Sequence, residues 1–354
     1  MTDLLDRPCA IRPGEELDAS RLSIYLQEHF PGAADLAVSQ FPSGHSNLTY
    51  LVRLGDRKLV LRRPPFGSKV RSAHDMGREY RVLSKLHAVY APAPEVLLFC
   101  DDLSVVGAPF YLMEPINGII LRKSIPAGLE FSPPIARAVS EAFIDNLVSL
   151  HQVDYAAAGL GDLGRPEGYM ERQVRGWSER YFAAKTDEYP EIEAIVAWLQ
   201  RNLPSSNAVA LIHNDYKYDN VILDADNIAR IKGVLDWEMC TLGDPLADLG
   251  TALAYWVETS DSEDHNQFLD GPTTQPGSLS RAELVARYAA KTGYDVSQIA
   301  YYLAFARFKL AVIVQQIYFR FHQGLTRDQR FASMPGTIQA LLKSSLRCAQ
   351  TGQI

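Results

Sequence analysis

Three polar residues within one stretch of the chain have the types and the spacing that catalysis could use. Asp215 follows a short apolar run, and Asn220 comes five positions later on the same predicted loop. Asp236 stands directly after the second of two short predicted strands that a turn separates. Phosphoryl transfer needs such a set, because one carboxylate orients the attacking hydroxyl while an amide and a second carboxylate hold Mg²⁺ on the nucleotide phosphates. We therefore predict Asp215 as the catalytic residue, with Asn220 and Asp236 as ligands of Mg²⁺.

Two sequence motifs around these residues resemble one family. They are HNDYKYDN at residues 213–220 and LDWEMCTLGDPLADLG at residues 235–250. Both are similar to the aminoglycoside phosphotransferase superfamily, whose members have a protein-kinase-like fold and phosphorylate small molecules. The order of an aspartate, an asparagine and, after a hairpin, a metal-binding aspartate is also that of protein kinases. Within the superfamily, the motifs resemble the kinase-like domain fused to some acyl-CoA dehydrogenases and stand-alone bacterial proteins assigned to the aminoglycoside phosphotransferases.

Four neighbours of these residues have supporting roles in this interpretation. We expect His213 and Asp248 to brace the catalytic loop through hydrogen bonds rather than to act as catalysts. Glu238 stands two residues after Asp236, on the same side of an extended chain, so it either supports a second metal ion or faces the acceptor. Lys217 either approaches the transferred phosphoryl group or points to solvent.

The elements that must position these residues predict an α+β fold with two lobes. The first lobe, residues 1–115, is expected to hold an N-terminal helix, then an antiparallel sheet and one main helix that bind the nucleotide. Apolar runs and turn residues predict strands at residues 37–41, 48–54, 58–62, 96–100 and 109–114, and helices at residues 18–30 and 75–87. The second lobe, residues 116–354, is expected to be mostly helical and to hold the catalytic loop, the metal site and the acceptor pocket. The family resemblance implies the same two-lobed, protein-kinase-like fold.

A loop of small residues separates the first two predicted strands. In kinase-like folds a loop at this place lays backbone N–H groups over the nucleotide phosphates. Here the loop has one glycine, fewer than the protein-kinase pattern, and an ordinary hairpin turn is the alternative. The residues that we predict to bind the nucleotide in this loop are Ser43, Gly44, His45, Ser46 and Asn47.

The third predicted strand ends in Arg62, where the kinase pattern has a lysine that grips the phosphates. We assign that role to Arg62, because relatives resembling LVLRRPP carry arginine there and a guanidinium can hold phosphate through a bidentate fork. Glu79 stands where a kinase-like helix would offer a carboxylate to this cation, so we predict that Glu79 pairs with Arg62. The alternatives are a solvent-facing arginine at a strand end and a solvated glutamate on a helix surface.

The run FYLMEPINGII, residues 110–120, resembles the hinge segment of the superfamily. The resemblance implies that backbone groups near Met113, Glu114 and Ile116 receive the adenine edge of ATP. Apolar strands that end in Glu-Pro are common, so this assignment depends on position alone.

The residues after 118 predict a helical lobe. Apolar patterns place helices at residues 133–151, 169–203 with a break near 189–190, 248–256, 280–292, 296–322 and 334–347. By resemblance, the segment 169–203 lies where the family builds its acceptor pocket. Its arginines Arg172, Arg175 and Arg180 stand beside aromatic residues and could suit an acyl or nucleotide-bearing acceptor. An exposed helix with a buried aromatic stripe is the alternative.

The composition of the 354 residues is that of an ordinary globular protein, with 47% hydrophobic and 22% charged residues. A net charge of -7 argues against a general nucleic-acid-binding surface, although a local basic pocket for phosphates is compatible with it. The four cysteines are far apart, which predicts a reducing compartment and no zinc site. The pattern of a signal peptide is absent, and no window has the length of a membrane span. We therefore expect a cytoplasmic monomer or homodimer that binds neither nucleic acid nor membranes.

The function that fits best is an ATP- and Mg²⁺-dependent kinase that phosphorylates a hydroxyl of a small molecule. Similarity to the domains fused to acyl-CoA dehydrogenases makes a hydroxylated acyl compound, or its CoA thioester, the preferred acceptor. An aminoglycoside or choline is an alternative, and the acidic segment 258–264 could receive ammonium groups. A nucleotide-binding regulatory module with little turnover is the alternative from another class, which the absent strand lysine favours. A metal hydrolase is disfavoured because the sequence has no histidine-rich ligand set, while the choice of ATP or GTP stays open.

Overall fold

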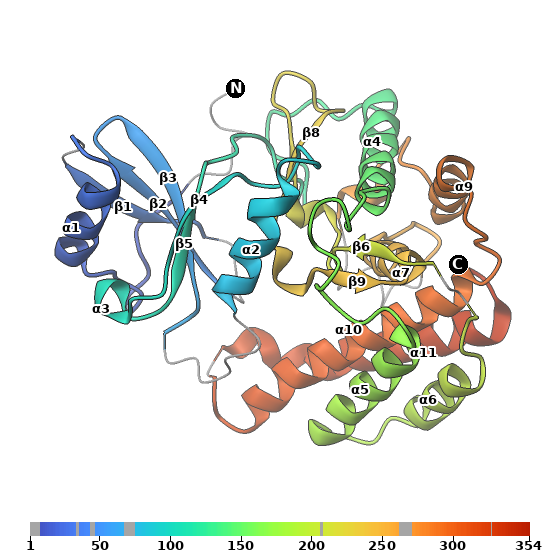
Figure 1. Ribbon diagram of the computed structural model, residues 1–354. Helices are drawn as coiled ribbons and strands as arrows, with labels where there is room; N and C mark the ends of the chain where they lie inside the picture. The colour runs from blue at the N-terminus through green and yellow to red at the C-terminus, as the bar shows by residue number, and fades with distance from the viewer. Residues whose placement is uncertain are drawn as a thin grey trace. The chain divides into compact units, whose positions relative to one another are not determined.

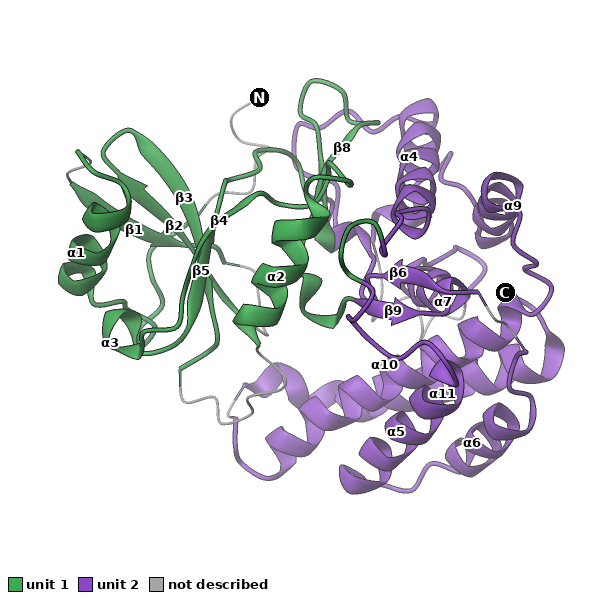
Figure 2. Ribbon diagram, in the orientation of Figure 1, with its two compact units in different colours: residues 1–120, 157–160, 220–240 green, residues 121–156, 161–219, 241–354 purple. Residues whose placement is uncertain are grey.

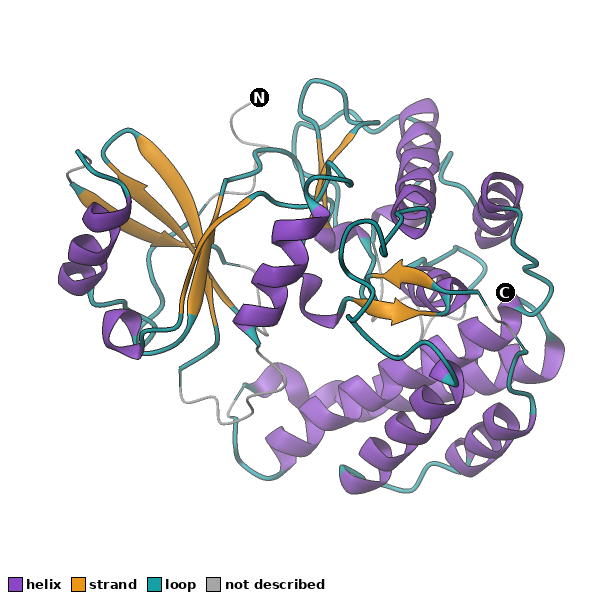
Figure 3. Ribbon diagram, in the orientation of Figure 1, coloured by secondary structure: helices purple, strands orange, loops and turns teal. Residues whose placement is uncertain are grey.

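The computed structural model describes residues 8–32, 35–42, 47–66, 75–205, 208–261, 271–326 and 328–354 (Figure 1). It contains both helices and antiparallel strands, which confirms the α+β prediction (Figure 3). The chain divides into two compact units (Figure 2). Unit 1 comprises residues 1–120, 157–160 and 220–240, and unit 2 comprises residues 121–156, 161–219 and 241–354. The division into functional lobes at residue 115 stays a prediction.

Unit 1 is built on a five-stranded antiparallel sheet with the strand order β1-β2-β3-β5-β4. Its strands are β1 (Leu36–Gln40), β2 (Leu48–Leu54), β3 (Arg57–Arg63), β4 (Val96–Cys100) and β5 (Phe110–Met113). All five predicted strands are present, and their ends differ from the prediction by no more than one residue. β3 is buried over its last five positions, where β2 and β5 flank it, and Arg62 therefore lies in the interior of the unit.

The two longer helices of unit 1 begin at aspartate caps. α1 (Ala19–His29) follows Asp18 and α2 (Met76–Leu86) follows Asp75, and each cap carboxylate accepts a hydrogen bond from a backbone N–H of the first turn. A short helix, α3 (Leu103–Val106), contacts α1 and was not predicted, because four residues are too few to show a helical period. Apolar side chains of α1, α3 and the sheet form one core.

A second hairpin of unit 1 lies between the two predicted metal ligands. Its strands β7 (Val221–Leu223) and β8 (Ile231–Val234) pair antiparallel, as predicted. Leu223 exchanges two backbone hydrogen bonds of 2.8 Å with Ile119. A Cβ at Gly118 would lie 2.3 Å from the carbonyl oxygen of Leu223, so glycine is needed where these two backbones meet.

Unit 2 is mostly helical, as predicted. Its helices are α4 (Pro133–His151), α5 (Tyr169–Ala183), α6 (Glu191–Arg201), α7 (Pro245–Tyr255), α9 (Arg281–Thr292), α10 (Ile299–His322) and α11 (Met334–Thr351). α10 packs against α5, α7 and α11, and most of its first half is buried all round. Its contact with α7 brings backbones together, because a Cβ at Gly250 would lie 2.7 Å from the carbonyl oxygen of Tyr302.

Two differences from the prediction in unit 2 lie beside the catalytic loop. β6 (Ala210–Ile212) pairs antiparallel with β9 (Thr241–Gly243), and both segments are too short to show a strand period. This pairing fixes the backbone at the point where the catalytic loop begins. α7 starts at Pro245 with Asp244 as its cap, ahead of the predicted start at Asp248, because proline at a first helical position needs no hydrogen-bond partner.

Short 3-10 helices lie at Tyr218–Asn220, Trp237–Met239, Pro272–Thr274 and Gln329–Ser333.

Candidate active site

Arg62 is the centre of a charged cluster in unit 1. Its side chain on β3 is 11% exposed. Its Nε donates to Glu79 Oε2 on α2 at 3.2 Å, and its Nη2 donates to Asp236 Oδ1. Glu238 Oε2 lies 3.9 Å from the same Nη2. The predicted pairing of Glu79 with Arg62 is present and the alternative of a solvent-facing arginine is wrong, while the role of Arg62 in binding phosphate stays a prediction.

The carboxylates around Arg62 keep it charged. Burial disfavours the charged guanidinium, but Glu79 and Asp236 outweigh burial and raise the pKa of Arg62 well above its ordinary value. With Glu238 also close, one cation faces three carboxylates. The cluster is therefore net negative when all of them are ionised, and such a cluster favours the approach of a divalent cation.

The predicted metal ligands Asn220 and Asp236 stand at the two ends of the β7–β8 hairpin. The carbonyl oxygen of Asn220 accepts a hydrogen bond of 2.8 Å from the backbone N–H of Leu235, so the hairpin brings the two ligand positions together. Asp236 has a φ of 70°, in the left-handed region that residues other than glycine rarely adopt. Backbone strain of this kind is concentrated at functional sites.

The donor set of these two residues fits Mg²⁺. Within the described part of the chain, no group of three or more His, Cys, Asp or Glu residues could enclose a metal ion. Mg²⁺ does not need such an enclosure, because it binds proteins through one or two carboxylates and completes its shell with water and substrate phosphates. One carboxylate and one amide oxygen are hard donors of the kind this ion prefers.

Asp215 in unit 2 is held by a lysine. Lys217 Nζ donates to both carboxylate oxygens of Asp215, at 2.9 and 2.8 Å, and lies 4.6 Å from the centroid of the Tyr255 ring. The hydroxyl of Tyr255 also hydrogen-bonds to Asp215, and burial raises the pKa of Tyr255. Lys217 therefore does not point to solvent, which removes one of its two predicted roles.

The catalytic loop is braced by Asp248 on α7. Its carboxylate accepts hydrogen bonds from the backbone N–H groups of His213 at 2.6 Å and Asn214 at 2.7 Å, and it lies 3.1 Å from His151 Nε2. Burial acts to raise the pKa of Asp248, but these partners outweigh it and hold the pKa below its ordinary value. His213 Nδ1 in turn accepts from the N–H of Asp215 at 3.3 Å. The expectation that His213 and Asp248 brace the loop is confirmed.

Glu238 links the charged cluster to the end of the predicted phosphate loop. Its Oε2 accepts a hydrogen bond of 2.8 Å from Nδ2 of the buried Asn47. The other predicted members of that loop, Ser43, Gly44, His45 and Ser46, lie outside the described residues. The predicted roles of Glu238 at a second metal or at the acceptor stay predictions.

The predicted hinge residues follow the end of β5 in unit 1. Met113 is the last residue of that strand and is buried. The backbone N–H of Glu114 donates to the carbonyl of Glu95 at 2.9 Å, and its carboxylate pairs with Arg57 at 3.2 Å. Ile116 packs against Gly233, where an added Cβ would meet its side chain at 2.8 Å. Adenine recognition by this segment stays a prediction.

Two arginines of the predicted acceptor segment have partners within unit 2. The guanidinium of Arg172 donates to the carbonyl oxygens of Glu167 and Arg165. Arg180 lies over the ring of Trp177, 4.5 Å from its centroid. Arg172 thus stabilises the start of α5 and Arg180 its middle. These contacts favour the alternative of an exposed helix with a buried aromatic stripe over an acceptor-binding role for the two arginines.

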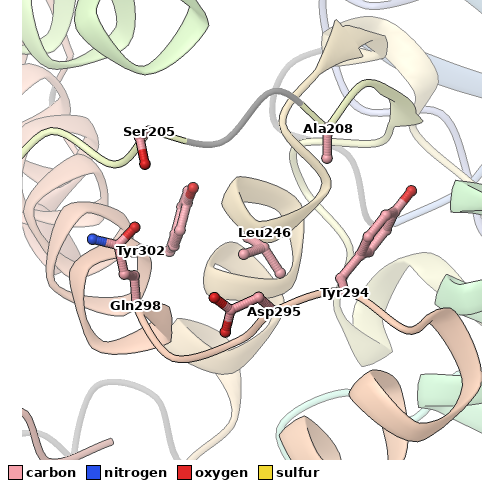
Figure 4. A pocket seen from close by; sticks show the side chains of 7 residues that line it. All are labelled: Ser205, Ala208, Leu246, Tyr294, Asp295, Gln298 and Tyr302. Carbon is pink, nitrogen blue, oxygen red and sulfur yellow. The ribbon is translucent and has the colours of Figure 1, made fainter.

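Two cavities open in unit 2. One of about 230 Å³ lies between α7, α10 and the segment before α10, with Leu246, Asp295 and Tyr302 among its lining residues (Figure 4). The other, of about 350 Å³, lies at the start of α5 and is lined in part by Tyr169 and Asp244. The described residues that line them do not include Asp215, so we assign the acceptor to neither cavity.

Some residues that contact the catalytic loop or its brace were missed by the sequence analysis, and three of them contact it through a polar group at a helix end or in a helix interior. They are Tyr255, His151 and Lys309, whose Nζ donates to the carbonyl oxygen of Asn214 at 2.9 Å. Lys309 has a sequence signal, because it is a lone lysine in an apolar run of the predicted helix 296–322. Tyr255 and His151 have no such signal, because aromatic residues at helix ends are common in cores.

The fold is a protein-kinase-like α+β fold. A structure of a candidate aminoglycoside phosphotransferase from Ralstonia eutropha matches with a TM-score of 0.79 and 28% identity, over 95% of this chain and 99% of that one. A complex of the aminoglycoside phosphotransferase APH(4)-Ia with AMP-PNP and hygromycin B matches with a TM-score of 0.58 and 15% identity, over 94% of this chain and 99% of that one. At that identity the second likeness shows the fold alone.

The profile of the phosphotransferase enzyme family matches residues 37–284, and the chain belongs to this family. The resemblance stated from the two motifs is thereby confirmed, and the chain stands among small-molecule phosphotransferases. Acyl-CoA dehydrogenase family member 11 of Rattus norvegicus is 33% identical over 351 residues, which are 96% of this chain and 44% of that protein. The chain thus spans less than half the length of this relative. Among its described helices, none is long and apolar enough to cross a membrane.

Proposed function

We propose that this protein transfers the γ-phosphoryl group of ATP, with Mg²⁺, to a hydroxyl of a small molecule. The observation that carries the proposal is the setting of Asp215, a carboxylate oriented by Lys217 on a loop that Asp248 braces. The oxygen donors of Asn220 and Asp236 support the choice of metal. Membership of the phosphotransferase enzyme family supports the reaction class.

Asp215 would accept a hydrogen bond from the attacking hydroxyl and hold it in line with the phosphorus. The transition state of phosphoryl transfer is loose, so orientation contributes more than the proton affinity of the carboxylate. The two hydrogen bonds from Lys217 limit the rotation of the carboxylate. A carboxylate oxygen has more than one lone pair, so the acceptor hydroxyl can bind without displacing Lys217.

Arg62 would bind a phosphate oxygen in the role that kinases give to a strand lysine. Glu79 anchors the guanidinium at its Nε, which leaves the Nη atoms to turn toward a ligand. Asp236 now accepts from Nη2, so nucleotide binding would exchange this carboxylate for phosphate at the guanidinium. Asn220 and Asp236 would then hold Mg²⁺, which when bound neutralises negative charge on the phosphates.

For the acceptor we propose a hydroxylated acyl compound, free or as its CoA thioester. The 33% identity with a protein named as an acyl-CoA dehydrogenase family member supports an acyl substrate. Cationic side chains near the catalytic loop support an anionic one. Burial raises the pKa of Asp219, and Arg122 and Lys123 lie close enough to counter part of that rise. Positive groups at this place would attract phosphate or carboxylate groups of an acceptor.

The described acidic residues of the segment 258–264, which are Glu258 and Asp261, give less support to an aminoglycoside acceptor than the sequence of the segment does. Glu258 and Asp261 both pair with Arg281, whose side chain is buried, and Glu258 lies 3.4 Å from it. Arg307 also lies 3.8 Å from Asp261, so two cations face these two carboxylates inside unit 2. Glu263 and Asp264 lie outside the described residues. A polycationic acceptor needs acidic groups that are available to it.

The test is an incubation of the purified protein with Mg²⁺ and ATP and a panel of alcohols. The panel holds hydroxy acids, hydroxyacyl-CoA thioesters, choline and aminoglycosides, and both ADP release and the mass of each acceptor are recorded. A gain of one phosphoryl group on a hydroxyacyl compound supports both parts of the proposal. A gain on choline or an aminoglycoside supports the reaction but overturns the acceptor. Mg²⁺-dependent ATP binding without any transfer overturns the reaction and favours a nucleotide-binding regulatory module.

A further inference from the structure

Lys309 is a buried cation in the helical core of unit 2. It lies on α10 with 3% of its surface exposed, and its Nζ donates to the carbonyl oxygen of Asn214 at 2.9 Å. The ring of Trp177 on α5 lies 5.7 Å from the same Nζ. Among the residues that the structure describes, Lys309 forms no ion pair with a carboxylate. Burying an ammonium without a paired anion is unfavourable, so the contact with Asn214 must offset much of that cost.

Asn214, the residue before the catalytic carboxylate, is held at three of its polar groups. Its N–H donates to Asp248 at 2.7 Å, its carbonyl accepts from Lys309, and its side-chain Oδ1 accepts from the hydroxyl of Tyr169 at 3.0 Å. Its φ is 67°, a left-handed conformation that asparagine adopts only at some cost. The surrounding contacts therefore maintain a conformation that the free chain would rarely populate.

The carbonyl of Asn214 and the N–H of Asp215 belong to one peptide plane. Lys309 binds the oxygen of this plane, and His213 Nδ1 accepts from its N–H at 3.3 Å. The plane is thus held from both ends. A rotation of the plane would leave a buried carbonyl without a donor and would turn the backbone from which the Asp215 side chain projects.

We propose that Lys309 is a positioning residue for phosphoryl transfer, because its ammonium holds the peptide plane between Asn214 and Asp215 and so fixes the direction of the Asp215 carboxylate. The proposal rests on the proposed function and deepens it. Lys309 does not touch the reacting atoms, and it acts through Asn214.

The test replaces Lys309 with methionine, which has a similar length and no charge, and with arginine, which keeps the charge and the donors. Release of ADP from Mg²⁺-ATP should show kcat lowered about 10- to 100-fold in Lys309→Met. The KM for ATP should stay within about threefold, because the nucleotide ligands are untouched. Lys309→Arg should recover part of the lost kcat.

A matched control is available on the same helix. Arg307 is also buried, at 5% exposed, and its Nη2 lies 3.8 Å from Asp261, a residue outside the catalytic loop. Arg307→Met should lower thermal stability while leaving kcat within about threefold. Equal losses of kcat in Arg307→Met and Lys309→Met, at similar shifts of melting temperature, would overturn the positioning role. Unchanged kcat in Lys309→Met would do the same.

A second measurement does not depend on turnover. Hydrogen–deuterium exchange of a peptide covering residues 211–218 should be faster in Lys309→Met than in the wild type, and unchanged in Arg307→Met. If Lys309→Met does not fold, Tyr169→Phe removes another contact of Asn214 with little change in volume, and exchange should again be faster. Unchanged exchange in these variants overturns the proposal. If exchange is faster in Lys309→Met but the wild type itself transfers no phosphoryl group, the proposed function is overturned. The role of Lys309 in holding the loop would then remain.

Discussion

The ammonium of Lys217 donates to both carboxylate oxygens of Asp215, at 2.9 and 2.8 Å. Burial acts to lower the pKa of Lys217, but Tyr255 and Asp215 outweigh burial and raise the pKa above its ordinary value. The lysine is therefore charged throughout the neutral range. A carboxylate in this setting is oriented before any acceptor arrives, as the proposed role of Asp215 requires.

Lys217→Met should lower kcat by about 10- to 100-fold, because Asp215 loses two charge-assisted hydrogen bonds and the orientation they impose. The KM for ATP should change little. Steady-state ADP release measures both constants. Lys185→Met is the control, since Lys185 pairs with Glu188 at 2.7 Å on the surface of unit 2, and it should keep the wild-type kcat. A wild-type kcat in Lys217→Met would show that Asp215 needs no such support.

Arg62→Met should destabilise the protein by about 3–5 kcal/mol, because it leaves the carboxylate of Glu79 buried without its cation. It should also weaken ATP binding at least about tenfold. Arg62→Lys keeps the charge without the fork and should fall between the wild type and Arg62→Met. Urea unfolding and titration calorimetry measure the two effects.

The control for Arg62 is Arg57→Met on the same strand. Arg57 is 43% exposed and pairs with Glu114 at 3.2 Å, so its loss should cost less than about 1 kcal/mol. Similar losses of stability in both variants would contradict the central place of Arg62 in the cluster.

Asp236→Ala should remove the effect of Mg²⁺ on ATP binding. In the wild type we expect ATP to bind about 10- to 100-fold more tightly with Mg²⁺ than with EDTA, because the metal links the phosphates to Asp236 and Asn220. In Asp236→Ala the two affinities should converge. Calorimetry with and without EDTA measures the difference, and an undiminished Mg²⁺ effect in the variant would place the metal elsewhere.

The free energy of unfolding should increase with pH because Lys309 loses its proton at a lower pH in the folded state than in the unfolded chain. Burial lowers the pKa of Lys309 to about 8, with Lys217 and Arg180 acting in the same direction and Asp215 and Asp248 against it. In the unfolded chain a lysine keeps its proton up to about pH 10.4. Between these values the unfolded state binds more protons, so raising the pH favours the folded state.

Lys309→Met isolates this contribution from those of other titrating groups. The free energy of unfolding of the wild type, minus that of Lys309→Met, should increase by up to about 3 kcal/mol between pH 7 and 10. Urea unfolding at several pH values measures the difference. Lys291→Met is the control, because Lys291 is 43% exposed and pairs with Asp145 on the surface, and its difference should stay nearly constant. A constant difference for Lys309→Met would mean that Lys309 titrates at its ordinary pKa.

Local patterns predicted the elements that carry the candidate site. The five strands of unit 1 and the β7–β8 hairpin follow from apolar runs between turn residues, which act over a few positions. The pairing of Glu79 with Arg62 was also predicted, although from the family resemblance rather than from the residues. The pairing of β6 with β9 was not, because three-residue strands carry no period of their own.

Contacts between distant parts of the chain could not be predicted in this way. Lys309 and Asn214 are 95 positions apart, and His151 and Asp248 are 97 apart. Each contact depends on how helices pack, which periodicity within one helix does not determine. The apolar surroundings of Lys309 in sequence are a signal of its burial but not of its partner.

The most direct test of the account concerns Asp215 itself. The measurement is transfer of labelled γ-phosphate from Mg²⁺-ATP to the acceptor that the panel identifies, comparing the wild type with Asp215→Asn. Asp187→Asn, the same change at an exposed position of unit 2 where the carboxylate accepts from Thr186, is the control and should transfer at close to the wild-type rate. We predict that Asp215→Asn loses about 10²- to 10⁴-fold in kcat while ATP affinity and melting temperature stay unchanged. Transfer by Asp215→Asn at the wild-type rate would contradict the assignment of Asp215 as the catalytic residue.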